Sequence, residues 1–388
     1  MLLQKALTGT RGYWFWVTAL VALVGLGVAA WLAQLQTGLA VTGLSRDVSW
    51  GLYIAQFTFL VGVAASAVMV VLPYYLHDCQ AFARVTILGE FLAVAAVVAC
   101  GLFILVDMGQ PSRVLNVVLY PSPRSLMFWD MLSLAGYLAM NLAIGWTTLS
   151  AERHEVAPPS WTRPLILLSI PWAISIHTVT AFLYAGLPGR SFWMTALLAP
   201  RFLASAFAAG PALLILLALL LRRVAAFDIG RAATGRLAVI VAYATVATLF
   251  FLLMETFTTF YSGIPEHAQH LRYLFTGLDG HAPFAPWMWT SVVLAFAGLV
   301  LLVVPSFAGN DRLLGLAAAA ILIALWIDKG LGLIVGGLVP TPFEQIVDYS
   351  PTAVEILIST GIWATGALLV TGFFKMVIAV RRETARAL

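Results

Sequence analysis

Eight ionisable side chains lie inside, or at the ends of, long apolar stretches of the sequence, and any chemistry would start from them. They are Glu90, Asp107, Asp130, His177, Glu255, Asp328, Lys329 and Glu355. An ionisable group in hydrocarbon is costly, so each one indicates a function or a specific partner. An imidazole that titrates near neutrality can pass protons together with a neighbouring carboxyl group. These residue types therefore favour proton-coupled chemistry inside a membrane.

Several of these side chains are expected at one depth, close to the outer surface. At about 1.5 Å of rise per residue, His177 and Asp130 both lie in the outer half of their predicted helices. Tyr184 follows His177 by seven residues, so the phenol and the imidazole share a helix face. Arg190 lies in the next loop, and Asp107 ends its helix at the outer boundary. Such groups could provide the hydrogen bonds and proton exchange that a quinone head group needs.

The same residues also have structural interpretations. His177 is compatible with a hydrogen-bonded residue between helices, and Asp130 with a polar helix–helix contact. Glu90 lies nearer the cytoplasmic end of its helix, where it would begin a proton path or bond to a Thr or Ser. Both interpretations stay open for each residue.

A second set of charges lies later in the chain. Asp328 and Lys329 are adjacent, so they point about 100° apart and need not pair with each other. We expect Lys329 to pair with Glu255, either as a structural salt bridge or within a proton or ion route. Glu355 begins its helix, where an acid suits the helix dipole. The proton-transfer candidates are Glu90, Glu255, Asp328 and Lys329.

The sequence offers few ligands for a redox centre of its own. Of the six histidines, only His177 lies well inside an apolar stretch, so a haem held by two membrane histidines is not expected. Cys79 and Cys100 cannot supply the four thiolates of an iron–sulfur cluster. We find no CxxCH, P-loop or Rossmann motif, and we expect no metal site. A quinone bound here would therefore exchange electrons with a partner subunit.

The elements that position these residues are membrane-spanning helices. Of the 388 residues, 62% are hydrophobic and 10% are charged, against roughly 25% charged in soluble domains. Stretches of about 20 apolar residues predict an all-α integral membrane protein with about ten transmembrane helices. The expected spans are 13–33, 51–76, 83–106, 125–148, 164–187, 200–221, 235–258, 287–306, 312–336 and 352–379. The net charge of +4, with no basic run, does not suggest a nucleic acid partner.

The distribution of basic residues predicts the orientation. With both termini in the cytoplasm, most of the 21 Lys and Arg residues lie on the cytoplasmic side. The outer side then holds few basic residues, Arg190 and Arg201 among them, and loops rich in Trp, Tyr, His and Pro. We expect a bacterial inner-membrane protein whose outer loops, near 107–124, 187–201 and 259–287, form a docking surface for a partner.

Four stretches of sequence resemble one family of membrane subunits. They are Val106–Arg113 (VDMGQPSR), Ser125–Met131 (SLMFWDM), Ser175–Phe182 (SIHTVTAF) with its continuation to Arg190, and Glu255–Gly263 (ETFTTFYSG). Together they are similar to the NrfD/PsrC-type membrane subunits of polysulfide reductase. The resemblance is closest to the DsrP-like branch, from the DsrMKJOP complex of sulfur metabolism, with HmcC and HybB as near relatives.

The resemblance implies an architecture and a site. It implies two four-helix bundles with one flanking helix at each end of the chain, divided as 1–40, 41–190, 191–340 and 341–388. A quinone pocket for menaquinone or ubiquinone would lie in the first bundle, with Asp130 and His177 as leading residues and Tyr184, Arg190 and Asp107 next. A ferredoxin-like iron–sulfur subunit would dock on the periplasmic face. Cytochrome c and cytochrome b/iron–sulfur subunits of a DsrMKJOP-like complex, and membrane lipids, would be further partners.

Two other functions are compatible with such a sequence. A secondary transporter or ion-translocating subunit would place its site near the midplane on broken helices, and Pro171 and Pro211 are candidates for such breaks. A purely structural anchor for redox partners would bind no quinone.

Overall fold

The chain folds into a bundle of long helices. The computed structural model describes residues 2–304 and 310–387. Within this part, 10 helical segments are long and apolar enough to cross a membrane, so the predicted all-α membrane protein with about ten spans is confirmed. They are α2 (Arg11–Thr37), α3 (Leu52–Ala64) with α4 (Val68–His77), α5 (Thr86–Asp107), α7 (Leu126–His154), α8 (Thr162–Ala185), α9 (Leu198–Val224), α10 (Arg231–Tyr261), α12 (Ala285–Val303), α13 (Asp311–Leu325) with η6 (Trp326–Gly332) and α14 (Leu333–Leu338), and α15 (Ala353–Ala387).

Short elements connect the spans. They are the helices α1 (Leu2–Ala6), α6 (Asn116–Leu119) and α11 (Pro265–Phe275), and the single turns η1 (Leu39–Val41), η2 (Gln80–Phe82), η3 (Pro111–Arg113) and η4 (Ser191–Trp193). All ten predicted spans overlap the observed helices, although residues 305 and 306 of the span 287–306 lie outside the described residues. The ends are less accurate, and α10 extends beyond the predicted 235–258 in both directions.

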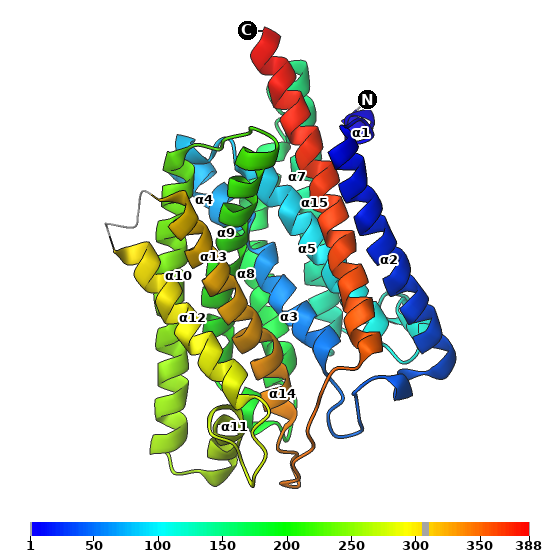
Figure 1. Cartoon of the computed structure of the whole chain (residues 1–388), viewed down its shortest axis with the longest axis vertical. Helices are drawn as coiled ribbons and strands as arrows, with labels where there is room; N and C mark the ends of the chain where they lie inside the picture. The colour runs from blue at the N-terminus through cyan, green and yellow to red at the C-terminus, as the bar shows by residue number, and fades with distance from the viewer. Residues whose placement is uncertain (1, 305–309, 388) are drawn as a thin grey trace.

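The two ends of the bundle differ in what they carry. Both chain termini lie at one end, as an even number of spans requires, and we call this end the terminal face (Figure 1). The opposite end, the loop face, carries α11 and the connections around it (Figure 1). The terminal face corresponds to the side predicted to be cytoplasmic.

For description, the helices are taken in two neighbouring groups. In the first, α3 packs on α5, α5 on α7, and α7 on α8; in the second, α9 packs on α10 and α13, and α12 on α13. Helix α9 packs against both α3 and α8 and so joins the groups, while α15 packs between α2 and α5 (Figure 1). The division into two four-helix bundles, with limits at residues 40, 190 and 340, stays a prediction.

The centre of the molecule contains an interrupted span. Residues 65–67 separate α3 from α4, and every residue of α3 is buried. Glycines on two neighbouring helices make room for this interruption. A Cβ atom on Gly210 of α9 would lie 2.6 Å from Ser66 N, and one on Gly89 of α5 would lie 3.1 Å from Ser66 O.

Neither of the two prolines that were candidates for helix breaks interrupts its helix. Pro171 lies inside the continuous helix α8, and Pro211 lies inside the continuous helix α9. Proline is tolerated within membrane helices because neighbouring helices and small local adjustments satisfy the freed backbone groups. The interruptions lie instead at residues 65–67 and in the π-helical segment η6.

Candidate functional site

The predicted acid is hydrogen-bonded to the helix that carries the predicted imidazole. The hydroxyl of Thr180 on α8 donates a hydrogen bond of 2.6 Å to Oδ1 of Asp130 on α7. Thr180 follows His177 by three residues, about one helical turn, so the Asp130 carboxyl lies against the face of α8 that carries the imidazole. All three side chains are buried. The partner of Asp130 is thus Thr180, which the sequence analysis did not single out although it lies one turn from His177.

His177 has an unusual environment for a buried imidazole. It is 0% exposed, and neither Nδ1 nor Nε2 has a hydrogen-bond partner among the described residues. Buried polar atoms are nearly always hydrogen-bonded, and leaving one unpaired costs about 1–3 kcal/mol. The fold therefore maintains a costly group, and a ligand or water that bonds to it would recover that free energy.

Tyr184 continues the same face of α8 toward the loop face. Its hydroxyl lies 2.6 Å from that of Thr58 on α3. Its ring packs against Trp50, Trp193 and Phe202, with centroid separations of 5.6, 5.4 and 5.9 Å. His177, Thr180 and Tyr184 therefore form one polar face of α8, closed at the loop-face end by aromatic side chains.

Two other predicted quinone-binding residues lie at the loop-face ends of the helices. Arg190 donates a hydrogen bond of 3.0 Å to the carbonyl of Leu338, which ties the loop after α8 to the end of α14. Partial burial lowers the pKa of this guanidinium from its usual value. Asp107 ends α5, and its Oδ1 is buried without a partner among the described residues. No contact between these two residues and His177 is recorded in the described part of the chain.

Glu90 lies toward the terminal face of the first group of helices. It is 2% exposed, and its Oε2 has no partner in residues 2–304 and 310–387. A Cβ atom added to Gly145 of α7 would lie 3.3 Å from this oxygen, so the glycine provides the space beside it. Farther toward the terminal face, Arg381 and Glu152 form an ion pair of 3.2 Å.

The second set of charges forms a closed network around one arginine. Arg201 of α9 pairs with Glu255 of α10 and lies 2.6 Å from Asp328 of η6, and all three side chains are buried. The expected pair of Lys329 and Glu255 is therefore wrong. The sequence prediction counted Arg201 with the outer loop 187–201, at the edge of the span 200–221. The helix begins at Leu198, and its first turn lies inside the bundle.

Lys329 lies beside this network, between α9 and α3. Its Nζ lies 3.3 Å from the carbonyl oxygen of Phe202 and 4.4 Å from the centre of that ring. A Cβ atom on Gly62 of α3 would lie 3.2 Å from the same Nζ. Asp328 and Lys329 thus have different neighbours, as predicted, and the lysine lies where the two groups meet.

Glu355 has the structural role expected of an acid at a helix start. Its carboxylate is 0% exposed and accepts hydrogen bonds from Gly43 N at 2.7 Å, Thr352 N at 2.9 Å and the Tyr349 hydroxyl at 2.7 Å. These bonds fix the start of α15 and the loop after α2. Burial and the nearby carboxylate raise the pKa of Tyr349.

Histidines of the loop face hold connecting segments together. His270 is buried on α11, with Nδ1 2.7 Å from the Gly336 carbonyl and Nε2 3.2 Å from the Ser191 hydroxyl. Burial lowers the pKa of His270 below the usual 6.5. His281 Nδ1 lies 2.5 Å from Asp348. Among the described residues, no group of three or more His, Cys, Asp or Glu side chains is arranged to hold a metal ion.

These features define a multi-pass membrane protein with buried, titratable side chains between its helices. Residues 40–340 match the family described as "Polysulphide reductase, NrfD", and the chain belongs to this family. The resemblance seen in its motifs is thereby confirmed at the level of the family, while the DsrP-like branch is not specifically supported.

Three relatives of the chain have names that refer to redox enzymes. The chain is 29% identical, over 93% of its length and 90% of the relative's, to a putative membrane subunit of dimethyl sulfoxide reductase from Halobacterium salinarum. It is 23% identical, over 90% of both chains, to a subunit of selenate reductase from Mesobacillus selenatarsenatis. It is 26% identical, over 52% of its length and 49% of the relative's, to the "Hdr-like menaquinol oxidoreductase integral membrane subunit" of Archaeoglobus fulgidus. Family and relatives support the coarser functional prediction, a membrane subunit of a redox complex.

Proposed function

We propose that this chain binds a membrane quinone, menaquinone or ubiquinone, and exchanges its electrons with a partner redox subunit while exchanging its protons through buried side chains. The observation that carries the proposal is the buried imidazole of His177, both of whose nitrogens lack a partner among the described residues. A quinone carbonyl beside it would supply the missing hydrogen bond. The family and the name of the Archaeoglobus fulgidus relative, which refers to a menaquinol oxidoreductase, are consistent with this substrate.

The arrangement of side chains suggests separate roles. His177 donates a hydrogen bond to a quinone carbonyl and is the nearest group to transfer a proton to it. Asp130, held by Thr180, exchanges protons with the same space. Tyr184, held by Thr58, closes the site toward the loop face, where Arg190 and Asp107 stay candidates for further contacts. Quinone reduction would take two electrons from the partner and two protons from these groups, and oxidation would return both.

Glu90 is our candidate for proton entry from the terminal face. Its buried oxygen is close to Gly145 of α7, and the buried face of that helix continues through Asn141 and Tyr137 to Asp130. Asn141 donates to the Tyr137 carbonyl at 2.8 Å, so this face is polar along part of its length. Protons that enter here and reach His177 would make turnover electrogenic.

The second group of helices has a different part in this proposal. Glu255 and Asp328 both hold Arg201, so their first role is to neutralise a buried charge. Lys329 has no recorded carboxylate partner in the described residues and lies against α3, so it is the better candidate for proton transfer between the groups.

The proposal also includes the partner subunit that exchanges electrons with the quinone. We propose a ferredoxin-like iron–sulfur subunit docked on the loop face, with that face in the periplasm, the termini in the cytoplasm, and the chain in the inner membrane. Two of the relatives bear the names of reductases of dimethyl sulfoxide and of selenate. For this chain we propose a complex of sulfur metabolism with cytochrome and iron–sulfur subunits, like DsrMKJOP.

The test is quinol-linked electron transfer by the purified complex. With a soluble menaquinol or ubiquinol analogue, His177→Ala should lower the rate by at least about 100-fold, the usual contribution of a positioned proton donor. Ile174→Ala is the matched control, because Ile174 lies one turn away on α8 and is 41% exposed on the outside of the bundle. Both variants should assemble with the partner subunits. An unchanged rate in an assembled His177→Ala complex would count decisively against a quinone at this site.

A secondary transporter or ion-translocating subunit is the second candidate function. Two interrupted segments, residues 65–67 and η6, occur in the buried centre, and broken helices are typical of transporter sites. Reconstituted protein without redox partners would then move an ion or solute into liposomes. Uptake by the isolated chain, with no quinone effect, would favour this function over ours.

A further inference from the structure

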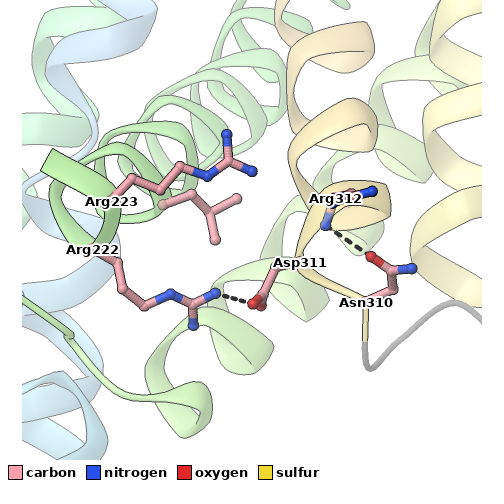
Figure 2. Close-up of a pocket in the computed structure, with 6 residues that line it drawn as sticks. Arg222, Arg223, Asn310, Asp311 and Arg312 are labelled. Carbon is pink, nitrogen blue, oxygen red and sulfur yellow. Dashed lines mark hydrogen bonds and ion pairs between the residues drawn. The ribbon is translucent and has the colours of Figure 1, made fainter. Parts of the chain in front are cut away.

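An arginine-lined cavity opens on the terminal face, far from the polar site described above. It lies between the end of α9 and the start of α13 and has a volume of about 490 Å³. Its lining residues are Leu219, Arg222, Arg223, Asn310, Asp311 and Arg312 (Figure 2). Nothing in the proposed quinone chemistry uses this cavity.

The cavity carries a net positive charge. Three guanidinium groups and one carboxylate line it, and Arg222 pairs with Asp311 (Figure 2). No carboxylate partner is recorded for Arg223 or Arg312 within residues 2–304 and 310–387, so two positive charges are left over. The planar guanidinium group presents a fork of donors that matches phosphate oxygens.

The backbone at the start of α13 is already engaged. The side chain of Asn310 accepts from Arg312 N at 2.9 Å and from Leu313 N at 3.5 Å. An anion in the cavity would therefore be held by the arginine side chains and not by these N–H groups. The arginine side chains, and not the N-terminus of α13, are therefore the groups that could bind an anion in this cavity.

Apolar side chains lie next to the cavity on the membrane side. Leu316 follows Arg312 by one helical turn and is 60% exposed, and Leu220 precedes Arg223 by about one turn and is 51% exposed. Arginines at the end of an apolar span therefore stand directly above exposed leucines. A soluble anion would use only the arginines, whereas a phospholipid would use both surfaces.

We propose that this cavity binds the phosphate group of an anionic membrane phospholipid, with its acyl chains over Leu220 and Leu316. Arg223 and Arg312 contact the phosphate oxygens, and Asp311 holds Arg222 at the edge of the site. A phospholipid and free phosphate both present charged phosphate oxygens to the arginines. The adjacent exposed leucines are the reason to assign the ligand to the lipid of the leaflet at the terminal face.

Lipid retention by the full chain in its complex tests this assignment. Native mass spectrometry would be used to titrate the protein with phosphatidylglycerol, with phosphatidylcholine of the same acyl chains, and with inorganic phosphate. The double variant Arg223→Gln/Arg312→Gln should weaken binding of phosphatidylglycerol about 30-fold, because each basic residue near a lipid surface contributes about one factor of five. Arg153→Gln/Arg231→Gln is the control of equal charge, since both arginines are exposed and lie outside the cavity.

A variant that gains affinity guards against loss by misfolding. Asp311→Asn removes the one carboxylate of the cavity and should raise the affinity for phosphatidylglycerol about fivefold. The proposal would be overturned if the cavity and control double variants bound phosphatidylglycerol with equal affinity. It would also be overturned if the native chain bound phosphatidylcholine as tightly as phosphatidylglycerol. Occupation by inorganic phosphate with no specific lipid retained would overturn the assignment to a lipid.

Discussion

Two buried polar clusters in this molecule are built on opposite principles. Around Arg201, the charge of the guanidinium is matched by Glu255 and Asp328 from two other spans. Around His177, the imidazole has no partner among the described residues, and Asp130 is held by one hydroxyl group. A satisfied network holds helices in position, whereas an unsatisfied one leaves donors and acceptors for a ligand. This difference is the basis on which we propose a positioning role for the first cluster and the quinone chemistry for the second.

Removing the central arginine should have the largest effect on stability. Arg201→Met leaves two buried carboxylates without a cation, and breaking a buried ion pair in this way costs about 3–5 kcal/mol. Thermal unfolding in detergent, followed by circular dichroism, would measure the loss. Arg222→Met is the matched control, because it also breaks an arginine–carboxylate pair on α9, but at a partly exposed position. That pair should contribute no more than about 1 kcal/mol.

An equal, small loss in the two arginine variants would contradict the comparison. It would mean that the carboxylates around Arg201 become neutral by taking up protons, and that this network can titrate. In that case the proton-transfer candidates Glu255 and Asp328 would regain the weight that the present geometry gives to Lys329.

Thr180→Val should have an intermediate effect on stability and a clear effect on turnover. The substitution keeps the shape of the side chain but removes the recorded partner of Asp130, which should cost about 1–3 kcal/mol. Quinol-linked turnover should fall because the carboxyl is no longer held toward the face of α8 that carries His177. Thr180→Ser restores the hydroxyl and should restore most of the turnover.

Thr178→Val separates this effect from a general change in α8. Thr178 also bonds to its own helix backbone, at 3.0 Å from Ile174 O, but it has no recorded contact with Asp130. If both valine variants lose the same turnover, the hydrogen bond between α7 and α8 is not what positions the acid.

The buried histidine of the loop face, His270, should have a smaller effect on stability, and this effect should depend on pH. Because burial lowers the pKa of His270 below 6.5, the unfolded chain binds its proton at a higher pH than the folded chain does. The stabilising contribution is therefore complete above about pH 6.5 and is lost as the pH falls, by at most about 1.4 kcal/mol per pH unit. Unfolding midpoints measured between pH 8 and 5 should show this decline in the native chain and a shallower one in His270→Gln.

His154→Gln provides the control for that measurement. This histidine ends α7 at the terminal face and is exposed, so its replacement should leave the decline unchanged. Equal slopes in the native chain and His270→Gln would show that His270 does not set the acid sensitivity.

The sequence contained the spans and the depth of the polar residues, because both follow from apolar length and helical rise. That is why Asp130 and His177 were expected at one depth, and why Glu355 was assigned to a helix start. The partners of Arg201 were beyond this reasoning, because the arginine at the edge of the predicted span 200–221 was counted with the outer loop and not with the bundle. The π-helical turn at 326–332, which carries Asp328 and Lys329, also leaves no mark in hydrophobic periodicity.

The sharpest form of the comparison is a substitution of a buried polar residue that should not lower stability. His177→Leu replaces a buried imidazole that has no recorded partner by an apolar side chain of similar size. The substitution removes the desolvation cost of the unpaired nitrogens. The free energy of unfolding should therefore stay the same or rise by up to about 1–3 kcal/mol, and the unfolding temperature should not fall. The same variant should lose quinol-linked turnover. A loss of stability comparable to that of Arg201→Met would show that His177 has structural partners in the folded complex, and the two clusters would then be alike.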